Sequence, residues 1–280
     1  MISNTDLEYF IEIAKSGHIS RAAERLGVTQ PSLSHCVKRM EQALGLQLFF
    51  RSKKGVELTP SGQRLYEEAD RLKDAWEQVV RSTHDEVELP QGLIRLGCHT
   101  AVAQYSLPLF LPKLATNYPD IRIRLNHGLS RHLVEAVITS KIDAAIAVNP
   151  IEHNDLIIKE LCTDLVTLWA PKKCVNAQLL MLAPELLQTQ EILRKLSQKK
   201  ITFKNHLESS SLEVIAQLLL AGVGCAILPK RVVDSLQTKT ASIVKNAPVY
   251  KDRICLVYKP EFRRVERGRV FIKLVSNCFK

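Results

Sequence analysis

The sequence lacks the short motifs that mark common enzymes. It contains no Gly-x-x-x-x-Gly-Lys phosphate loop, no His-Glu-x-x-His zinc motif, no Gly-x-Ser-x-Gly nucleophile motif and no dinucleotide fingerprint. Its eight histidines are scattered without the spacing of metal ligands. We therefore expect a protein that is not an enzyme and holds neither a metal nor a cofactor.

Paired cysteines and long apolar runs are also absent. No Cys-x-x-Cys pair occurs among the seven cysteines, which is typical of reduced thiols inside a cell. The longest apolar stretch, residues 218–229, is too short to cross a bilayer. Asp6, Glu8 and Glu12 occupy the region where a signal peptide would be apolar. These absences predict a cytoplasmic chain with no membrane partner.

Positive charge is in modest excess and gathers at the two ends of the chain. The 39 Lys and Arg residues outnumber the 29 Asp and Glu residues, which gives a formal net charge of +10. Residues 1–64 hold 9 basic and 6 acidic residues, and residues 251–280 hold 9 and 3. A basic N-terminal segment fits a polyanionic partner.

A helix-turn-helix pattern occupies residues 20–44. Ser20 can cap the first short helix, and Gly27 suits the left-handed position after it. Thr29 can cap the second helix, with Pro31 in its first turn. An earlier helix is expected to begin at the capping box of residues 5–8. The pattern predicts that the second helix of the pair fits a DNA major groove.

The two faces of that second helix differ in character. Leu33, Val37, Met40 and Leu44 fall on one apolar stripe. The polar residues, with which the helix would contact base edges and phosphates, are Thr29, Gln30, Ser32, Ser34, His35, Lys38 and Arg39. Taken alone, this pattern also fits an ordinary amphipathic helix with a solvated face.

A short hairpin is predicted after Gly45. Two alternating runs between residues 46 and 59 flank a turn near Lys54, which is typical of a wing. Arg51, Lys53 and Lys54 would then lie along the phosphate backbone or in the minor groove. The alternative is a basic surface hairpin.

A long helix is expected to follow, capped by Thr59. Its apolar residues repeat as in a short coiled coil, which predicts a dimer contact made by Leu65, Leu72, Trp76 and Val79. The alternative is that this stripe packs on its own domain. A dimer would present two recognition helices to two DNA half-sites.

These residues together resemble the winged helix-turn-helix and linker helix of LysR-type transcriptional regulators. The resemblance is carried by Leu7-x-x-Phe10, Ala22-Ala23-x-x-Leu26-x-Val28-x-Gln30-Pro31-Ser32-Leu33-Ser34, Glu41-x-x-Leu44-Gly45-x-x-Leu48-Phe49-x-Arg51 and Leu58-Thr59-Pro60-x-Gly62. Phe50 and Cys36 depart from the family's usual polar residues, and a thiol at Cys36 would be open to modification if it faced DNA.

Beyond Pro90 the chain alternates between strands and helices. Strands are expected at residues 93–98, 121–125 and 143–148, with helices between them, which predicts a parallel sheet. Further on, residues 181–197 should be helical and residues 200–203 a strand. A single terminal helix is expected over residues 263–278.

The same resemblance implies the fold and the domain limits. The fold is expected to be an N-terminal all-α winged helix-turn-helix with a long linker helix, plus an α/β two-lobed periplasmic-binding-protein-like effector domain. The expected limits are 1–60 for the DNA-binding domain, 61–89 for the linker and dimerisation helix, 91–162 with 256–280 for lobe I, and 163–255 for lobe II.

An effector site is expected in the cleft between the lobes, beyond the carboxyl ends of the strands. The candidate residues are His99, Thr100, Gly128, Ser130, Phe203 and Lys204. Thr100 and Ser130 could donate hydrogen bonds to a carboxylate, and the alternative is that both are ordinary helix caps.

We therefore expect a ligand-responsive, sequence-specific DNA-binding transcriptional regulator. Its expected partners are double-stranded DNA, a small-molecule co-inducer and further copies of itself in a homodimer or homotetramer, and by family resemblance RNA polymerase is a further candidate. A constitutive architectural DNA-binding protein is the main rival, but it would hardly need two α/β lobes with a cleft. Cleft movement would act through differential affinity of the ligand for two states.

Overall fold

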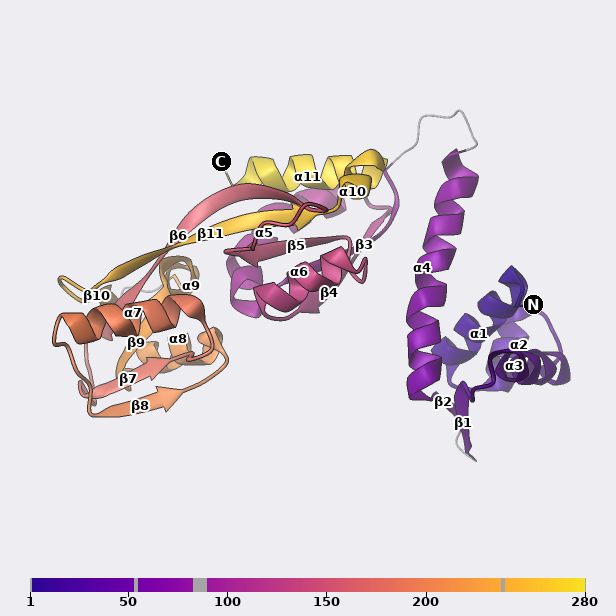
Figure 1. Cartoon of the computed structure of the whole chain (residues 1–280), viewed down its shortest axis with the longest axis horizontal. Coiled ribbons are helices and arrows are strands. Elements are labelled where there is room, and N and C mark those ends of the chain that lie inside the picture. Colours follow the sequence, from indigo (N-terminus) through magenta and orange to yellow (C-terminus); the bar gives the residue numbers. More distant parts are fainter. Residues whose placement is uncertain (1, 53–54, 83–89, 238–239, 280) are drawn as a thin grey trace. The chain divides into compact units, whose positions relative to one another are not determined.

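The computed structural model describes residues 2–52, 55–82, 90–237 and 240–279 (Figure 1). The chain forms two compact units, Met1–Glu88 and Leu89–Lys280. Each unit has hydrophobic clusters of its own, as expected of separate domains.

The first unit packs four helices against a small hairpin. Its elements are α1 (Asn4–Ser16), α2 (Ile19–Leu26), α3 (Gln30–Leu44), β1 (Phe49–Ser52), β2 (Gly55–Leu58) and α4 (Pro60–Ser82). Phe10 and Ile13 of α1 and Leu33, Val37 and Met40 of α3 are fully buried in one cluster. The stripe predicted from the sequence is therefore the apolar back of α3, which holds this helix in place.

The helix ends confirm some predicted caps and correct others. Thr29 caps α3 by accepting a hydrogen bond from the Ser32 N–H, and Gly27 takes the left-handed conformation after α2. The expected start of α1 was wrong, because Ser3 is its cap and pairs reciprocally with Asp6 in a capping box. The expected Ser20 cap was also wrong, since α2 already begins at Ile19.

Two glycines allow close backbone approaches in this unit. Gly55 has a φ of 128°, and a Cβ there would lie 2.3 Å from the Gly17 carbonyl oxygen. Its neighbour Val56 donates a backbone hydrogen bond of 2.8 Å to that same oxygen, which ties the hairpin to the turn after α1. A Cβ at Gly62, in the first turn of α4, would lie 2.0 Å from the Leu48 carbonyl oxygen.

The second unit is built on one large mixed sheet. Its strands are β3 (Gly92–Cys98), β4 (Ile121–His127), β5 (Ala144–Val148), β6 (Ile157–Pro171), β7 (Leu179–Leu182), β8 (Asn205–Glu208), β9 (Cys225–Pro229), β10 (Ala241–Ile243) and β11 (Val249–Tyr258). Its helices are α5 (Thr100–Asn117), α6 (Ser130–Ile138), α7 (Leu187–Gln198), α8 (Leu212–Leu220), α9 (Lys230–Ser235), α10 (Pro260–Arg264) and α11 (Glu266–Cys278).

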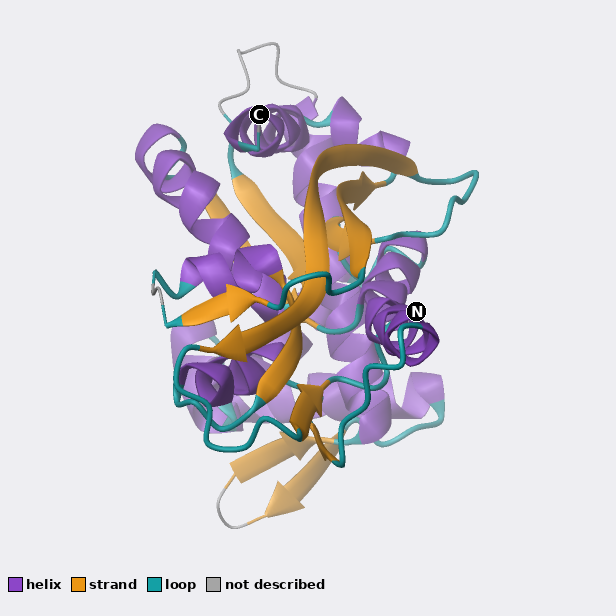
Figure 2. Ribbon diagram, turned by 90° about the vertical axis from the view of Figure 1, so that its left-hand side faces the viewer, coloured by secondary structure: helices purple, strands orange, loops and turns teal. Residues whose placement is uncertain are grey.

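Two lobes share this sheet and are joined by its two longest strands. The strand order is β4-β3-β5-β11-β6-β9-β7-β8, with β10 also paired to β6. The predicted parallel pairing of β3 with β4 and β5 is confirmed. Strands β6 and β11 run antiparallel and side by side from one lobe to the other (Figure 1), and both curve along their length (Figure 2).

The crossing of β11 between the lobes falls within the strand. Ile254 to Tyr258 already pair with β5 of the first lobe, whereas Val249 to Arg253 pair with β6 alone. The register of β11 on β6 shifts between Ile254 and Cys255. The domain limits expected from the sequence assign residue 255 to lobe II, although Cys255 pairs with β5 of lobe I. The exact limits of the lobes stay a prediction.

Several element predictions in the second unit were wrong. The segment expected to be one helix over residues 181–197 begins as strand β7 and becomes helix α7 only at Leu187. No strand forms at residues 200–203, and β8 begins at Asn205 instead. The terminal helix is divided at Val265 into α10 and α11.

Candidate DNA-binding surface and ligand cavity

Helix α3 presents a polar front opposite its buried back. Thr29, Gln30, Ser32, His35 and Lys38 are exposed, and Ser34 is half-buried. The Gln30 side-chain amide donates a 2.9 Å hydrogen bond to the Ser34 hydroxyl, and the Thr29 and Ser32 hydroxyls lie 2.9 Å apart. Leu44 is 39% exposed, so the predicted apolar stripe ends at Met40. The front therefore offers hydroxyl, amide and ammonium groups in one patch.

A buried carboxylate that the sequence analysis missed fixes the flank of α3. Asp6 of α1 accepts hydrogen bonds from the Cys36 thiol and from the guanidinium of Arg39. Burial alone would raise the pKa of Asp6, but hydrogen bonds from Ser3, Cys36 and Arg39 together lower it to about 2. Arg39 is thus held against the protein at one side of the polar front.

Burial determines the chemistry of Cys36. Its side chain is buried, and its pKa is raised to about 12 by burial first and then by the hydrogen bond and charge of Asp6. A thiol with such a pKa stays protonated and is a poor nucleophile. The modification of Cys36 considered from the sequence is therefore disfavoured, and the thiol acts as a donor inside the domain.

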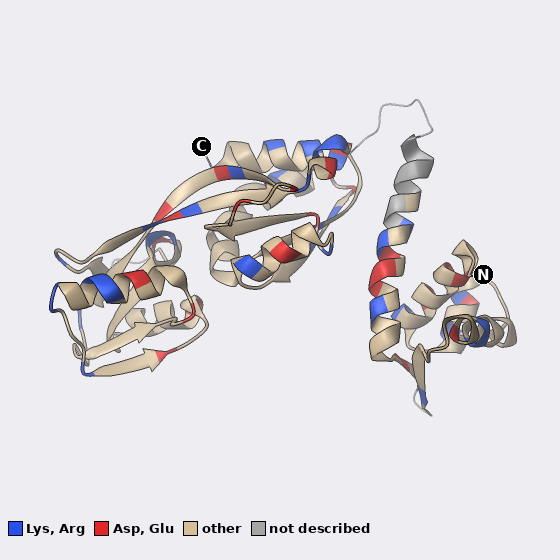
Figure 3. Cartoon of the chain, viewed as in Figure 1, with Lys and Arg blue, Asp and Glu red and all other residues tan. Residues whose placement is uncertain are grey.

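The hairpin is joined to α3 by Glu41. Its carboxylate accepts hydrogen bonds from the N–H groups of Leu48 (2.9 Å) and Phe49 (3.3 Å) at the start of β1. A carboxylate oxygen also lies 3.9 Å from a guanidinium nitrogen of Arg51, which is exposed on β1. Figure 3 shows the basic residues of α3 and β1 in blue. The expected contacts of Lys53 and Lys54 fall on residues outside the described part of the chain.

The expected seam on α4 divides into two parts. Leu65 and Ala69 pack against the core of their own unit, as the alternative interpretation foresaw. Leu72 and Trp76, further along α4, are 53% and 55% exposed. The side chain of Val79 lies outside the described residues. An exposed Leu and Trp one helical turn apart form an apolar strip that could be covered by a second chain.

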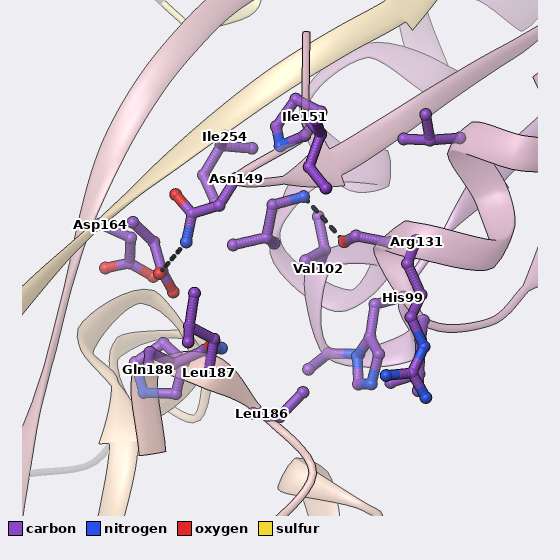
Figure 4. Close-up of a pocket in the computed structure, with 18 of the residues that line it drawn as sticks. His99, Val102, Arg131, Asn149, Ile151, Asp164, Leu186, Leu187, Gln188 and Ile254 are labelled. Carbon is purple, nitrogen blue, oxygen red and sulfur yellow. Dashed lines mark hydrogen bonds between the residues drawn. The ribbon is translucent and has the colours of Figure 1, made fainter. Parts of the chain in front are cut away.

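A cavity of about 380 Å³ lies where the two lobes of the second unit meet (Figure 4). Residues from both lobes line it: α5 and α6 supply part of the wall from one side, and residues around the start of α7 supply part from the other. The joining strands β6 and β11 contribute Asp164, Asp252 and Ile254. This volume fits a small organic molecule.

Two of the six expected effector residues line this cavity. His99 caps α5, and its Nδ1 accepts a 3.2 Å hydrogen bond from the Ala101 N–H, which places the proton of the neutral ring on Nε2. Burial lowers the pKa of His99, although the charge of Glu213 acts in the opposite direction. The Ser130 hydroxyl accepts a 2.8 Å hydrogen bond from the Val148 N–H, so its own hydrogen is left to donate. The alternative role of Ser130 as a side-chain cap of α6 was wrong.

The other four expected residues do not line the cavity. Thr100 is exposed and borders a neighbouring shallow hollow with His127. Gly128 lies near Leu133 without reaching the cavity wall. Phe203 packs on a core cluster of the second lobe, and Lys204 lies just before β8. Phe203 and Lys204 were expected at the cleft because a strand was expected to end there, at residues 200–203. That strand does not form.

The cavity contains two buried acids that sequence analysis missed. Asp164 on β6 and Asp252 on β11 are only 4% and 2% exposed, and they are register partners across the antiparallel pair. Asp164 accepts backbone hydrogen bonds from Leu165 (2.8 Å) and Arg231 (3.2 Å). Asp252 accepts one of 2.7 Å from the Asn149 side-chain amide. The pKa values of Asp164 and Asp252 are both raised, and burial is the main cause.

Two further features bear on function. Among the residues that the structure describes, no helix is both long and apolar enough to cross a membrane. Over the same residues, no group of three or more His, Cys, Asp or Glu side chains is placed to hold a metal ion.

Comparison with family models matches both units of the chain. Residues 5–63 match the bacterial regulatory helix-turn-helix protein model of the lysR family, and residues 88–278 match the LysR substrate binding domain model. The second match alone spans more than half of the chain.

Whole-chain relatives agree with these matches. The chain is 27% identical over 279 residues to the HTH-type transcriptional regulator YofA of Bacillus subtilis, covering 97% of this chain and 98% of that protein. A full-length OxyR variant from Pseudomonas aeruginosa has a similar fold, with a TM-score of 0.67 and 23% identity over 100% of this chain and 95% of that one. Full-length CbnR complexed with its target DNA gives a TM-score of 0.53 and 21% identity, covering 99% and 100% of the two chains.

Proposed function

Because this chain belongs to the LysR family of helix-turn-helix transcriptional regulators, we propose that α3 enters a DNA major groove and that a small effector binds in the cavity between the lobes. The family membership makes the protein a DNA-binding regulator with an effector-binding domain.

The observation that carries the DNA-reading proposal is the division of α3 into two faces. Its apolar residues Leu33, Val37 and Met40 are buried, while its polar residues face away from the core. Gln30 and Ser34 are the base-reading candidates, because amide and hydroxyl groups can contact base edges. Lys38 and, on the wing, Arg51 are the phosphate-contact candidates. Ser32, His35 and Thr29 complete the surface, and Arg39 is held at its flank.

Pairing of two chains through α4 would supply two recognition helices. The exposed strip of Leu72 and Trp76 supports this arrangement. A homodimer, or a homotetramer formed from two dimers, would place these helices in successive major grooves. The chain would act in the cytoplasm, and RNA polymerase is the partner through which it would change transcription.

Effector binding in the cavity would favour one arrangement of the two lobes. Because β6 and β11 join the lobes and also line the cavity, a ligand there contacts both lobes and the strands between them. His99 Nε2 and the Ser130 hydroxyl are candidate donors to the ligand. The ligand changes DNA binding only if its affinity for the two lobe arrangements differs.

Selection of bound genomic fragments by the full-length protein tests the DNA-reading proposal. The parent chain should return a motif with two half-sites. Gln30→Ala and Ser34→Ala should each relax the base preference, at a cost of roughly 1–3 kcal/mol where a good base contact is lost. Gln42→Ala, on an exposed part of α3 two turns further along, is the matched control. An identical motif from the parent and both test variants would reject the assignment.

The effector proposal is tested with the operator that this selection provides. Small-molecule fractions from cells are added to the protein–operator complex, and a shift in affinity identifies an active fraction. Val148→Trp places a larger side chain in the cavity wall and so leaves less room for a ligand. This variant should lose the effector-dependent shift in operator affinity and keep its affinity for the operator in the absence of effector. A shift that persists in a folded Val148→Trp protein would place the effector elsewhere.

A further inference from the structure

Acidic side chains outnumber basic ones around the cavity. Five carboxylates line it, from Glu135, Glu152, Asp164, Glu185 and Asp252, whereas Arg131 is its single guanidinium, with His99 and His153 as the imidazoles. Arg131, Glu135, Glu152 and Glu185 are all exposed, so solvent screens these four charges, whereas Asp164 and Asp252 are buried. The two buried acids therefore dominate the electrostatics of the interior, and in their ionised form they favour a positively charged ligand over a negatively charged one.

The least exposed of these acids, Asp252, has an acceptor oxygen to which no donor of the described residues bonds. Asn149 donates to Oδ1 of Asp252, and among the described residues no donor contacts Oδ2. No ion pair with either Asp164 or Asp252 occurs in the described part of the chain. A buried carboxylate oxygen at a cavity wall without a donor is a strong acceptor for a ligand.

The opposing strand makes this acceptor stronger. Asp164 faces Asp252 directly across the β6–β11 pair, and like charges in this position repel. The guanidinium carbon of Arg231 lies 5.9 Å from the Tyr105 ring centroid, and the Arg231 charge offsets part of the rise that burial causes in the pKa of Asp164, but only the backbone N–H of Arg231 donates a hydrogen bond to Asp164. A positively charged ligand group in the cavity, next to the carboxylates of Asp164 and Asp252, would relieve this repulsion.

Much of the remaining wall is apolar. Hydrocarbon side chains are contributed to it by Val102, Val148, Leu187, Val232 and Ile254. A ligand that fills the cavity therefore needs an apolar body next to its polar head. Figure 4 shows Asp164 and Asn149 grouped at one side of the cavity, with Val102 and His99 on another.

We infer that the effector is a small organic cation whose ammonium group lies against Asp252 and Asp164 and whose apolar body fills the rest of the cavity. This inference rests on the proposed function, because it names the ligand class of the same cavity. Asp252 and Asp164 are the binding residues, and their position on both joining strands lets the cation bias the lobe arrangement.

Binding of a cation has a proton signature. Burial first, and then the charge of Asp164, raise the pKa of Asp252 to about 7, against the effect of the Asn149 hydrogen bond. Tyr105 on α5 is a further titratable neighbour, since the charge of Asp252 contributes to the raised pKa of Tyr105. An ammonium group would lower this pKa, so binding near neutral pH should release a proton.

Three probes with the same alkyl chain test the inference on the full-length protein. Hexylammonium, hexanoate and hexanol are compared by calorimetry at about pH 7, in two buffers of different ionisation enthalpy. We expect hexylammonium to bind with proton release and at least tenfold more tightly than hexanoate. Asp252→Asn should weaken hexylammonium at least tenfold and abolish the proton release, whereas Asp120→Asn, an exposed acid away from the cavity, should change neither.

The possible failures are distinguishable. Hexanoate binding as tightly as hexylammonium, or hexylammonium binding unchanged in a folded Asp252→Asn protein, would overturn the cation inference. If Val148→Trp removed that hexanoate binding, the cavity would still be a ligand site and the proposed function would stand. Failure of all three probes to bind the parent protein would also overturn the inference, and the operator experiment would then decide the proposed function alone.

Discussion

Asp6 gives the most quantitative prediction about the DNA-binding unit. The carboxylate is 3% exposed, completes the capping box of α1, and accepts hydrogen bonds from Cys36 and Arg39 of α3. It therefore joins the first helix of the domain to the helix that we propose reads DNA. Replacement by Asn keeps the size of the side chain but removes its charge.

The expected magnitude follows from the pKa of Asp6. The folded protein lowers this pKa from the ordinary value of 3.8 to about 2. A lowered pKa means that the ionised form stabilises the fold above the unfolded-state pKa, and that this contribution is lost as the pH falls through the folded-state pKa. The contribution is about 2 kcal/mol at neutral pH and should fall to roughly half of that near pH 3.

Urea unfolding of a chain of residues 1–88 measures this contribution by its helical circular dichroism. At neutral pH Asp6→Asn should reduce the free energy of unfolding by about 2 kcal/mol, and the difference from the parent should shrink between about pH 4 and pH 2. Glu8→Gln, an exposed acid on the same helix, is the control and should change the free energy by less than about 0.5 kcal/mol. A difference between parent and Asp6→Asn that stays constant down to pH 2 would refute the electrostatic account.

Three further outcomes are expected. Gly62→Ala should lower the free energy of unfolding by about 2 kcal/mol or more, because the new Cβ would meet the Leu48 carbonyl oxygen. Gly45→Ala is the control: a Cβ there has open space, so the change should cost only about 1 kcal/mol of backbone strain. Equal losses of stability in thermal unfolding would contradict the steric explanation. Lys38→Ala should reduce the slope of log affinity against log salt by about one in operator titrations, and an unchanged slope would remove its phosphate contact. Leu72→Asp should give monomers in light scattering, and dimers that persist would move the interface away from this strip.

The local features of the first unit could be predicted from the sequence because they depend on neighbours within one or two helical turns. Thr29 caps α3 and Gly27 ends α2 as expected, and the buried stripe of Leu33, Val37 and Met40 follows from helical spacing alone. The start of α1 was missed because residues 3–6 and residues 5–8 both have the pattern of a capping box. The box of Ser3 and Asp6 forms, and Asp6 also accepts a hydrogen bond from Cys36 of α3, which the sequence does not reveal.

The cavity shows what local pattern does not determine. The β/α alternation of the first lobe predicted its parallel strands, and with them His99 and Ser130 at the cleft. Phe203 and Lys204 were misplaced because a short apolar run can be a strand or a packed loop, and the packing of Phe203 on the core cluster of Val166 and Leu168 decided for the loop.

The sequence alone determined the family, the order of the elements and the polar front of α3, because each of these depends on residues that are close together in the chain. The pairing of Asp164 with Asp252 comes only from the tertiary structure. These residues lie on strands far apart in sequence, and their register is set by the packing of two lobes on both strands. Spacing along the chain carries no record of that alignment, so neither acid could be assigned to the cavity before the fold was known.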